Sequence, residues 1–226
     1  TSVFASLDIS GDIDVDGTTN LDVVDVDGAV NFAADVTFAD GADIITATAG
    51  TSNFRAGVNA GNSIASGGNY NVAVGDEAGT AITTGDTNVA VGYQSLSTED
   101  TGRQSVAVGY QALAVQNKDD TNLNTAVGYQ AGLAITTGVS NDIFGGSAGD
   151  ALTTGSFNVA IGRSSLSADT LGSTSVAVGH AALATQNFTT ATNVYNTAVG
   201  YSAGNDITTG LRNTIIGGLA GDALTD

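Results

Sequence analysis

Short runs in which apolar residues alternate with polar or small ones recur along most of the chain. In a typical run, Val72 and Val74 alternate with Asn71 and Ala73, and the alternation ends at Gly75. A period of two predicts a β-strand, and the glycine after it predicts a turn. We therefore expect each run to form a strand, a glycine turn, a second short strand and a connector.

The runs belong to an internal repeat. Its unit is [Asn/Ser]-x-[Ala/Ile]-[Val/Ile/Phe]-Gly-x-x-[Ala/Ser]-[Gly/Leu], and we number its positions from the initial Asn or Ser. Most units are 17 residues long, and two longer ones carry insertions after Leu113 and Leu183. Complete units begin at Asn71, Asn88, Ser105, Asn124, Asn141, Asn158, Ser175, Asn196 and Asn213, and a degenerate unit begins at Asn53.

A unit of this length cannot bury its own apolar face, so the units must stack as coils. The sequence predicts an all-β fold in which residues 51–226 form a β-solenoid of about ten coils. The unit-initial Asn side chains are expected to form a hydrogen-bonded ladder along the stack. We also expect the array to continue past residue 226, because the final connector stops at Leu224-Thr225, whereas an earlier one runs on as Leu152-Thr153-Thr154-Gly155.

Residues 1–50 are richer in aspartate and are predicted to form a separate stalk-like β segment. Asp12, Asp14 and Asp16, followed by a glycine, have the spacing of the first ligands of a calcium-binding loop. The closing glutamate of that motif is absent, and alternating aspartates on the solvent face of a strand explain the pattern equally well. The same two interpretations apply to Asp40 and Asp43. Calcium is the only cofactor that the sequence suggests.

The charge balance restricts the partners of the chain. Five Lys and Arg residues stand against 23 Asp and Glu residues, giving a formal net charge of −18. Nucleic acid is therefore an unsuitable partner, because phosphate binding needs basic side chains. No segment has the roughly 18 to 20 consecutive apolar residues of a membrane span, so membrane insertion is not expected. The chain has no cysteine, which excludes disulfides and thiolate metal sites.

No catalytic constellation is visible in the sequence. His180 is the only histidine, so a catalytic triad or a histidine metal cluster cannot form within one chain. The chain is predicted to be non-enzymatic. The best binding candidates occupy position six of the unit, and they are Tyr93, Tyr110, Tyr129, Tyr201 and His180. Such a column could bind sugar rings, or it could cover a seam between neighbouring chains.

Self-association is expected from the thin core. A single row of coils filled by Ala and Val buries little surface per residue, and packing side by side would supply more. The small Ala at position three is predicted to let three chains approach one another closely. Physical reasoning alone does not distinguish three chains from two.

The segment Asn88-Val89-Ala90-Val91-Gly92-Tyr93-Gln94-Ser95 resembles the repeats of trimeric autotransporter adhesin heads. It resembles still more the Gly-Tyr-Gln-Ala arrays of phage and prophage tail-fibre proteins. The resemblance covers roughly residues 53–226, and it implies a homotrimeric, left-handed β-roll outside the cell, on a virion tail fibre or a cell surface. The 17-residue units are longer than the usual adhesin-head coil. Residues 7–17 similarly resemble shaft segments of phage fibres.

These features predict a structural or adhesive fibre segment that spaces and presents a surface for host attachment. A cell-surface glycan or protein receptor would be its target. One alternative is a bacterial trimeric adhesin head or a self-assembling extracellular filament. Another is a polysaccharide-degrading fibre enzyme, which would need paired acidic residues in a groove between chains.

Overall fold

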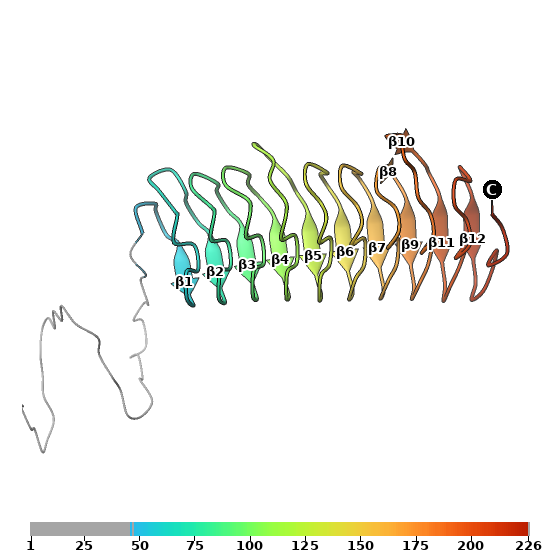
Figure 1. Cartoon of the computed structure of the whole chain (residues 1–226), viewed down its shortest axis with the longest axis horizontal. Helices are drawn as coiled ribbons and strands as arrows, with labels where there is room; N and C mark the ends of the chain where they lie inside the picture. Colours follow the sequence, from blue (N-terminus) through green and yellow to red (C-terminus); the bar gives the residue numbers. More distant parts are fainter. Residues whose placement is uncertain (1–45, 47, 226) are drawn as a thin grey trace, which may run out of the picture. The chain divides into compact units, whose positions relative to one another are not determined.

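The described part of the chain is a stack of parallel β-coils. The computed structural model describes residue 46 and residues 48–225, and these residues contain strands and turns but no helix (Figure 1). Each coil gives one three-residue strand to a ten-stranded parallel sheet. The prediction of an all-β solenoid of about ten coils is thus confirmed. The strands of this sheet are β1 (Phe54–Ala56), β2 (Val72–Val74), β3 (Val89–Val91), β4 (Val106–Val108), β5 (Thr125–Val127), β6 (Asp142–Phe144), β7 (Val159–Ile161), β9 (Val176–Val178), β11 (Thr197–Val199) and β12 (Thr214–Ile216).

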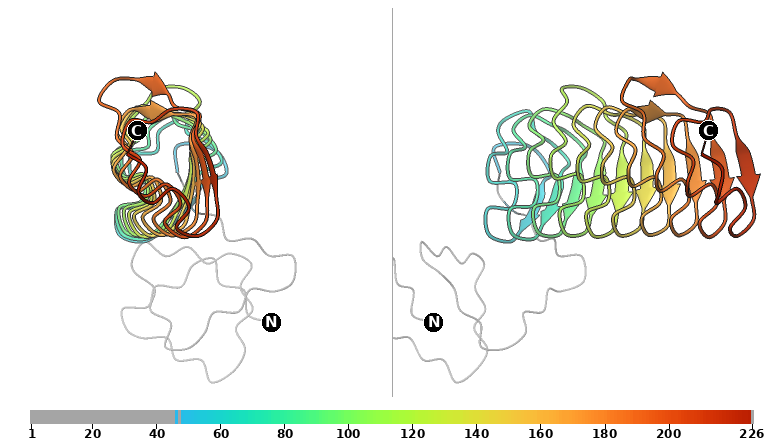
Figure 2. Two further views of the ribbon diagram at one scale, coloured as in Figure 1. Left: turned by 90° about the vertical axis from the view of Figure 1, so that its right-hand side faces the viewer. Right: turned by 45° about the vertical axis from the view of Figure 1, so that its right-hand side comes forward.

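Equivalent positions of successive units lie on top of one another. Between β2 and β3, for example, Ala73 pairs with Ala90. The two remaining strands, β8 (Gly172–Ser173) and β10 (Thr192–Asn193), form a separate parallel pair. They lie outside the large sheet, with β8 shortly before β9 and β10 shortly before β11 along the chain (Figures 1 and 2). The insertion after Leu183 therefore extends the edge of the solenoid without disturbing the ten-stranded register.

The prediction of a second strand in each unit is wrong. The residues after the glycine form a turn, because positions seven and nine adopt left-handed backbone conformations, as at Gln94 (φ 52°) and Leu96 (φ 50°). Extended backbone cannot pass through two such corners. Hydrogen bonds between coils continue here nonetheless, since the Gln94 amide donates to the Asp76 carbonyl at 3.0 Å. The coil thus closes within 17 residues.

Position five requires glycine in every coil. At Gly109 the φ angle is 133°, a conformation that L-residues rarely adopt. A Cβ atom at this position would lie 2.3 Å from the carbonyl oxygen of Gly128 in the next coil. The column of glycines therefore lets adjacent turns approach to backbone contact.

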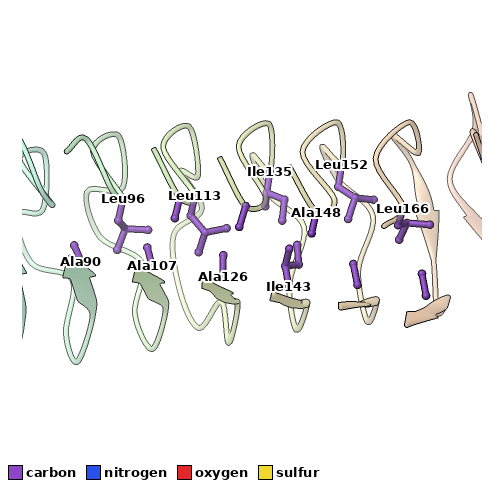
Figure 3. Packing of buried hydrophobic residues seen from close by; sticks show 14 of the residues in the cluster. Ala90, Leu96, Ala107, Leu113, Ala126, Ile135, Ile143, Ala148, Leu152 and Leu166 are labelled. Carbon is purple, nitrogen blue, oxygen red and sulfur yellow. The ribbon is translucent and has the colours of Figure 1, made fainter. Parts of the chain in front are cut away.

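In most coils the interior is filled by one large aliphatic side chain and two small residues. Ala73 and Ala78 are fully buried beside Ile82, and a Cβ added at Gly79 would lie 2.8 Å from the Ile82 Cδ1 atom. Where position nine is Leu instead of Gly, as at Leu96, the leucine fills the same interior. Figure 3 shows Leu96, Ala90 of the same coil and Ile135 of another coil pointing into the coils. The two kinds of unit are alternative ways of filling one volume.

The predicted role of the position-three alanines in chain association is wrong. Ala73, Ala90 and their equivalents are 0% exposed inside the coils, so they cannot contact a neighbouring chain. Because side chains alternate along a strand, the residues at positions two and four point outward instead. Val72 and Val74 accordingly remain half-buried at the surface.

The predicted asparagine ladder is confirmed. The backbone N–H of Asn71 donates to the side-chain Oδ1 atom of Asn53 at 2.8 Å. In the next coil, the backbone N–H of Asn88 donates to the Oδ1 atom of Asn71 at 2.9 Å. Each side chain also closes its own coil, since the Asn71 Nδ2 atom donates to the Gly85 carbonyl at 2.8 Å. These buried amides are therefore satisfied without any ligand.

Candidate functional site

The predicted position-six residues form an exposed column along the solenoid. The Tyr93 and Tyr110 rings stack with centroids 5.3 Å apart, and the Tyr110 and Tyr129 rings do the same at 5.3 Å. Farther along, His180 stacks on Tyr201 at 5.2 Å. The structure thus brings the five predicted residues together as two separate stacks.

A ladder of glutamines runs beside the first stack, at position seven. The Gln111 Nε2 atom donates to the Gln94 Oε1 atom at 2.9 Å, and the Gln130 Nε2 atom donates to the Gln111 Oε1 atom at 2.9 Å. The ladder ends at Glu77, whose carboxylate accepts from the Gln94 Nε2 atom at 2.7 Å. Partial burial, followed by the negative charge of Glu77, raises the pKa of Tyr93.

Stacking limits how this column can bind a ligand. Rings that lie face to face cover one another, so Tyr110 presents only its edge and hydroxyl group to solvent. A free aromatic face remains only where a stack ends. The predicted contact with sugar rings would therefore be confined to such ends. Whether the column covers a seam between chains stays a prediction.

The interval between the two stacks consists of two coils without an aromatic residue at position six. These coils carry Gly146 and Arg163. A Cβ atom added at Gly146 would meet nothing within 4 Å. Sequence analysis did not select either residue, although the doubled glycine, Gly145-Gly146, was a visible signal.

A buried carboxylate that sequence analysis also missed lies inside the solenoid. Glu99 is 0% exposed and accepts hydrogen bonds from the Gly102 amide (2.8 Å), the Gln116 Nε2 atom (2.9 Å) and the Asn122 Nδ2 atom (2.9 Å). Burial raises the pKa of Glu99, and the bonds from Gln116 and Gly102 offset part of that effect. The Asn122 Oδ1 atom is buried without a hydrogen-bond partner.

The Gln116 side chain connects the asparagine ladder on the two sides of Ser105, where the unit has no asparagine. Ser105 replaces asparagine in this coil, and the Gln116 Nε2 atom donates to the Ser105 Oγ atom at 2.9 Å. The Gln116 Oε1 atom in turn accepts from the Asn124 Nδ2 atom at 2.8 Å. Without this glutamine the ladder would end at Ser105.

The same arrangement recurs at Gln186. The Gln186 Nε2 atom donates to Asp169 at 2.6 Å and to the Ser175 Oγ atom at 3.0 Å, and its Oε1 atom accepts from the Asn196 Nδ2 atom at 2.8 Å. A sequence signal existed: the units with Leu at position nine replace the aliphatic residue at position twelve by Glu, Gln or Asp.

The buried acids offer no reactive surface. Glu99 and Asp169 are both 0% exposed and bound by donors from their own chain, so a substrate cannot reach them. Within residues 48–225, no three His, Cys, Asp or Glu residues are grouped so as to hold a metal ion. The calcium candidates Asp12, Asp14 and Asp16, together with Asp40 and Asp43, lie outside the described residues.

No protein-family model, curated protein or solved structure matches the chain. In the part of the chain that the structure describes, no helix is long and apolar enough to cross a membrane. What is established is the class of fold, a parallel β-solenoid with an exposed aromatic column. Its function must be argued from that surface.

Proposed function

We propose that the solenoid is a non-enzymatic spacer segment of an extracellular fibre, resembling a phage tail fibre, that holds a recognition surface away from its base. Three copies of the chain would pack along their length through the outward face of the ten-stranded sheet. The fibre would attach to a glycan or protein receptor on a cell surface. Repeated weak contacts along such a rod would give avidity.

The observation that carries this proposal is an unbroken apolar column on the outside of the sheet. Position four is apolar in every complete unit, and its side chains are only half-buried or exposed in the single chain. Exposed fractions reach 39% at Phe144, 40% at Ile161 and 71% at Ile216. The column consists of Val74, Val91, Val108, Val127, Phe144, Ile161, Val178, Val199 and Ile216.

An apolar face that extends over nine coils suits a partner of equal length and equal period. Contiguous exposed apolar surface on a soluble protein commonly marks an interaction site. A second copy in the same register would repeat each contact along the rod, and closed rotational symmetry would leave no copy with an unpaired face. The number three rests on the resemblance to tail fibres and adhesin heads.

The mass of the intact chain in solution tests the proposal. Light scattering at several concentrations should give a stable mass of three chains. Val108→Lys should lower the mass by burying a charge in the interface, whereas Thr137→Lys, on an exposed connector, should leave it unchanged. A wild-type monomer would overturn the shared-face proposal. Loss of the trimer on calcium chelation would instead assign a structural role to Asp12, Asp14 and Asp16.

A second candidate is a self-assembling extracellular filament or a bacterial adhesin head. Within the described residues, β1 pairs only with β2, and β12 pairs only with β11. End-to-end growth would require the terminal strands of neighbouring chains to pair in the same parallel manner. Negative-stain electron microscopy separates the candidates, because a spacer gives rods of one length and a filament gives a range of lengths.

A further inference from the structure

The aromatic column has a gap whose dimensions match one inserted ring. Tyr129 ends the first stack, Gly146 follows in the next coil, and Arg163 occupies position six one coil farther on. Rings in adjacent coils of this stack lie 5.3 Å apart. A ring placed in the Gly146 coil would therefore lie about one such spacing from Tyr129, within the roughly 4.5 to 7 Å that suits stacked aromatic rings.

The gap is open to solvent. A Cβ atom at Gly146 would meet nothing within 4 Å, and φ at this glycine lies outside the left-handed range. Tyr129 is 56% exposed, compared with 43% for Tyr110, which has a ring on both faces, and 40% for Tyr93 at the other end of the stack. The difference fits an outer face of Tyr129 that no side chain covers.

The two walls of the gap favour an aromatic ring. One wall is the electron-rich face of Tyr129, and the other coil carries Arg163, whose guanidinium has no ion pair or hydrogen bond within residues 48–225. A ring between them would stack on the tyrosine and attract the cation. Tyr and Arg are both enriched in protein-binding hot spots.

We propose that the gap at Gly146 binds an aromatic side chain projected by a partner protein. A second copy of this chain in the same register carries the same gap at the same height, so its own position-six column cannot supply the ring. The site goes beyond the spacer role and does not depend on how many copies associate. A related arrangement recurs at Tyr201, which is 59% exposed and precedes Gly218, another glycine whose Cβ would meet nothing within 4 Å.

Nuclear magnetic resonance on the intact chain, with its six tyrosine rings labelled, tests this proposal. The probe is N-acetyl-tryptophanamide, which should shift the Tyr129 signals with a dissociation constant of about 1 to 10 mM and leave those of Tyr93 unchanged. Gly146→Tyr adds the missing ring and should abolish the shift at Tyr129 while leaving any shift at Tyr201. Arg163→Ala should weaken binding about two- to fivefold.

A control variant at the other end of the stack and a carbohydrate probe test whether binding is specific to the gap and to aromatic rings. Tyr93→Leu removes a ring from the opposite end of the same stack and should leave binding at Tyr129 intact. Equal shifts at Tyr93 and Tyr129, no shift at all, or unchanged binding in Gly146→Tyr would overturn the site. Tighter binding in Arg163→Ala would mean that the arginine itself fills the gap. Binding of methyl β-glucoside in place of the tryptophan probe would reassign the site to carbohydrate and reject the proposal.

Discussion

Two adjacent glycines, Gly145 and Gly146, should respond in opposite ways to the same substitution. Gly145 has a φ of 138°, and a Cβ there would lie 2.6 Å from the carbonyl carbon of Gly162 in the next coil. The unfavourable backbone conformation costs about 1 to 3 kcal/mol, and forcing extra volume between packed coils costs about 1 to 3 kcal/mol more. Gly145→Ala should thus lower the free energy of unfolding by about 2 to 6 kcal/mol.

The control is Gly146→Ala, at the neighbouring residue. Its Cβ meets no atom within 4 Å, and its backbone is outside the left-handed region. The variant should be neutral or more stable by roughly 0.4 to 1 kcal/mol, since alanine restricts the unfolded chain. A neutral or stabilising effect of Gly146→Ala would also show that position six of this coil tolerates a side chain.

Urea unfolding followed by far-ultraviolet circular dichroism, at one protein concentration, measures both effects. The cost of Gly145→Ala falls at the contact between the β6 and β7 coils, so the array could also split there and unfold in two steps. Equal stability of the two variants would refute the reasoning that backbone contact between turns determines the glycine column. Strong destabilisation by Gly146→Ala would refute the open gap.

Three further outcomes follow from the buried residues. Gln116→Met should destabilise the fold by about 2 to 5 kcal/mol, because it removes partners from buried polar groups, whereas Gln94→Met on the surface ladder should cost less than about 1 kcal/mol by the same urea assay. Leu166→Ala should cost about 2 to 5 kcal/mol through the cavity it leaves, measured in the same way. The raised pKa of Glu99 means that the folded state binds its proton up to a higher pH than the unfolded state. The unfolding free energy of wild type relative to Glu99→Gln should therefore fall as the pH rises above about 4.5 and level off beyond the folded-state pKa, and a rise would contradict it.

The sequence was sufficient to predict the repeat, the parallel stack and the asparagine ladder. All three follow from periodicity, since a polar residue such as Asn71 that returns at a fixed interval must lie over its equivalent in the next coil. Periodicity did not decide which face of each strand points inward. A two-residue period places Ala73 and Val74 on opposite faces, and either assignment gives the same pattern. In most coils the inward residue is the alanine, which leaves room for the buried Leu or Ile at position nine or twelve. An exception is Ile143, which is buried in the same coil as Leu152.

The left-handed turns and the hydrogen bonds of Gln116 could not be predicted from periodicity, for two different reasons. Left-handed corners at Gln94 and Leu96 are rare for such residues, and neighbouring coils hold them in place. The relay through Gln116 joins residues 11 positions apart, Ser105 and Gln116, and the contact exists only once the coil has closed. Sequence reasoning selected the exposed tyrosines correctly as a column, yet it could not see that stacking would cover their faces.

In each coil, the positions that hold the stack together are different from the positions whose residues can vary at the surface. Positions one, three and five are tied to the ladder, the core and the contact between turns, and each admits few residue types. Position six touches none of these, and in this single chain it holds Val, Asp, Tyr, Gly, Arg and His. A solenoid built this way can exchange its position-six residues one coil at a time without disturbing the asparagine ladder, the core or the contacts between the glycine turns. The proposed spacer with a recognition surface would need this division. The residues that vary from coil to coil, including those at the gap after Tyr129, lie on the outside of the solenoid.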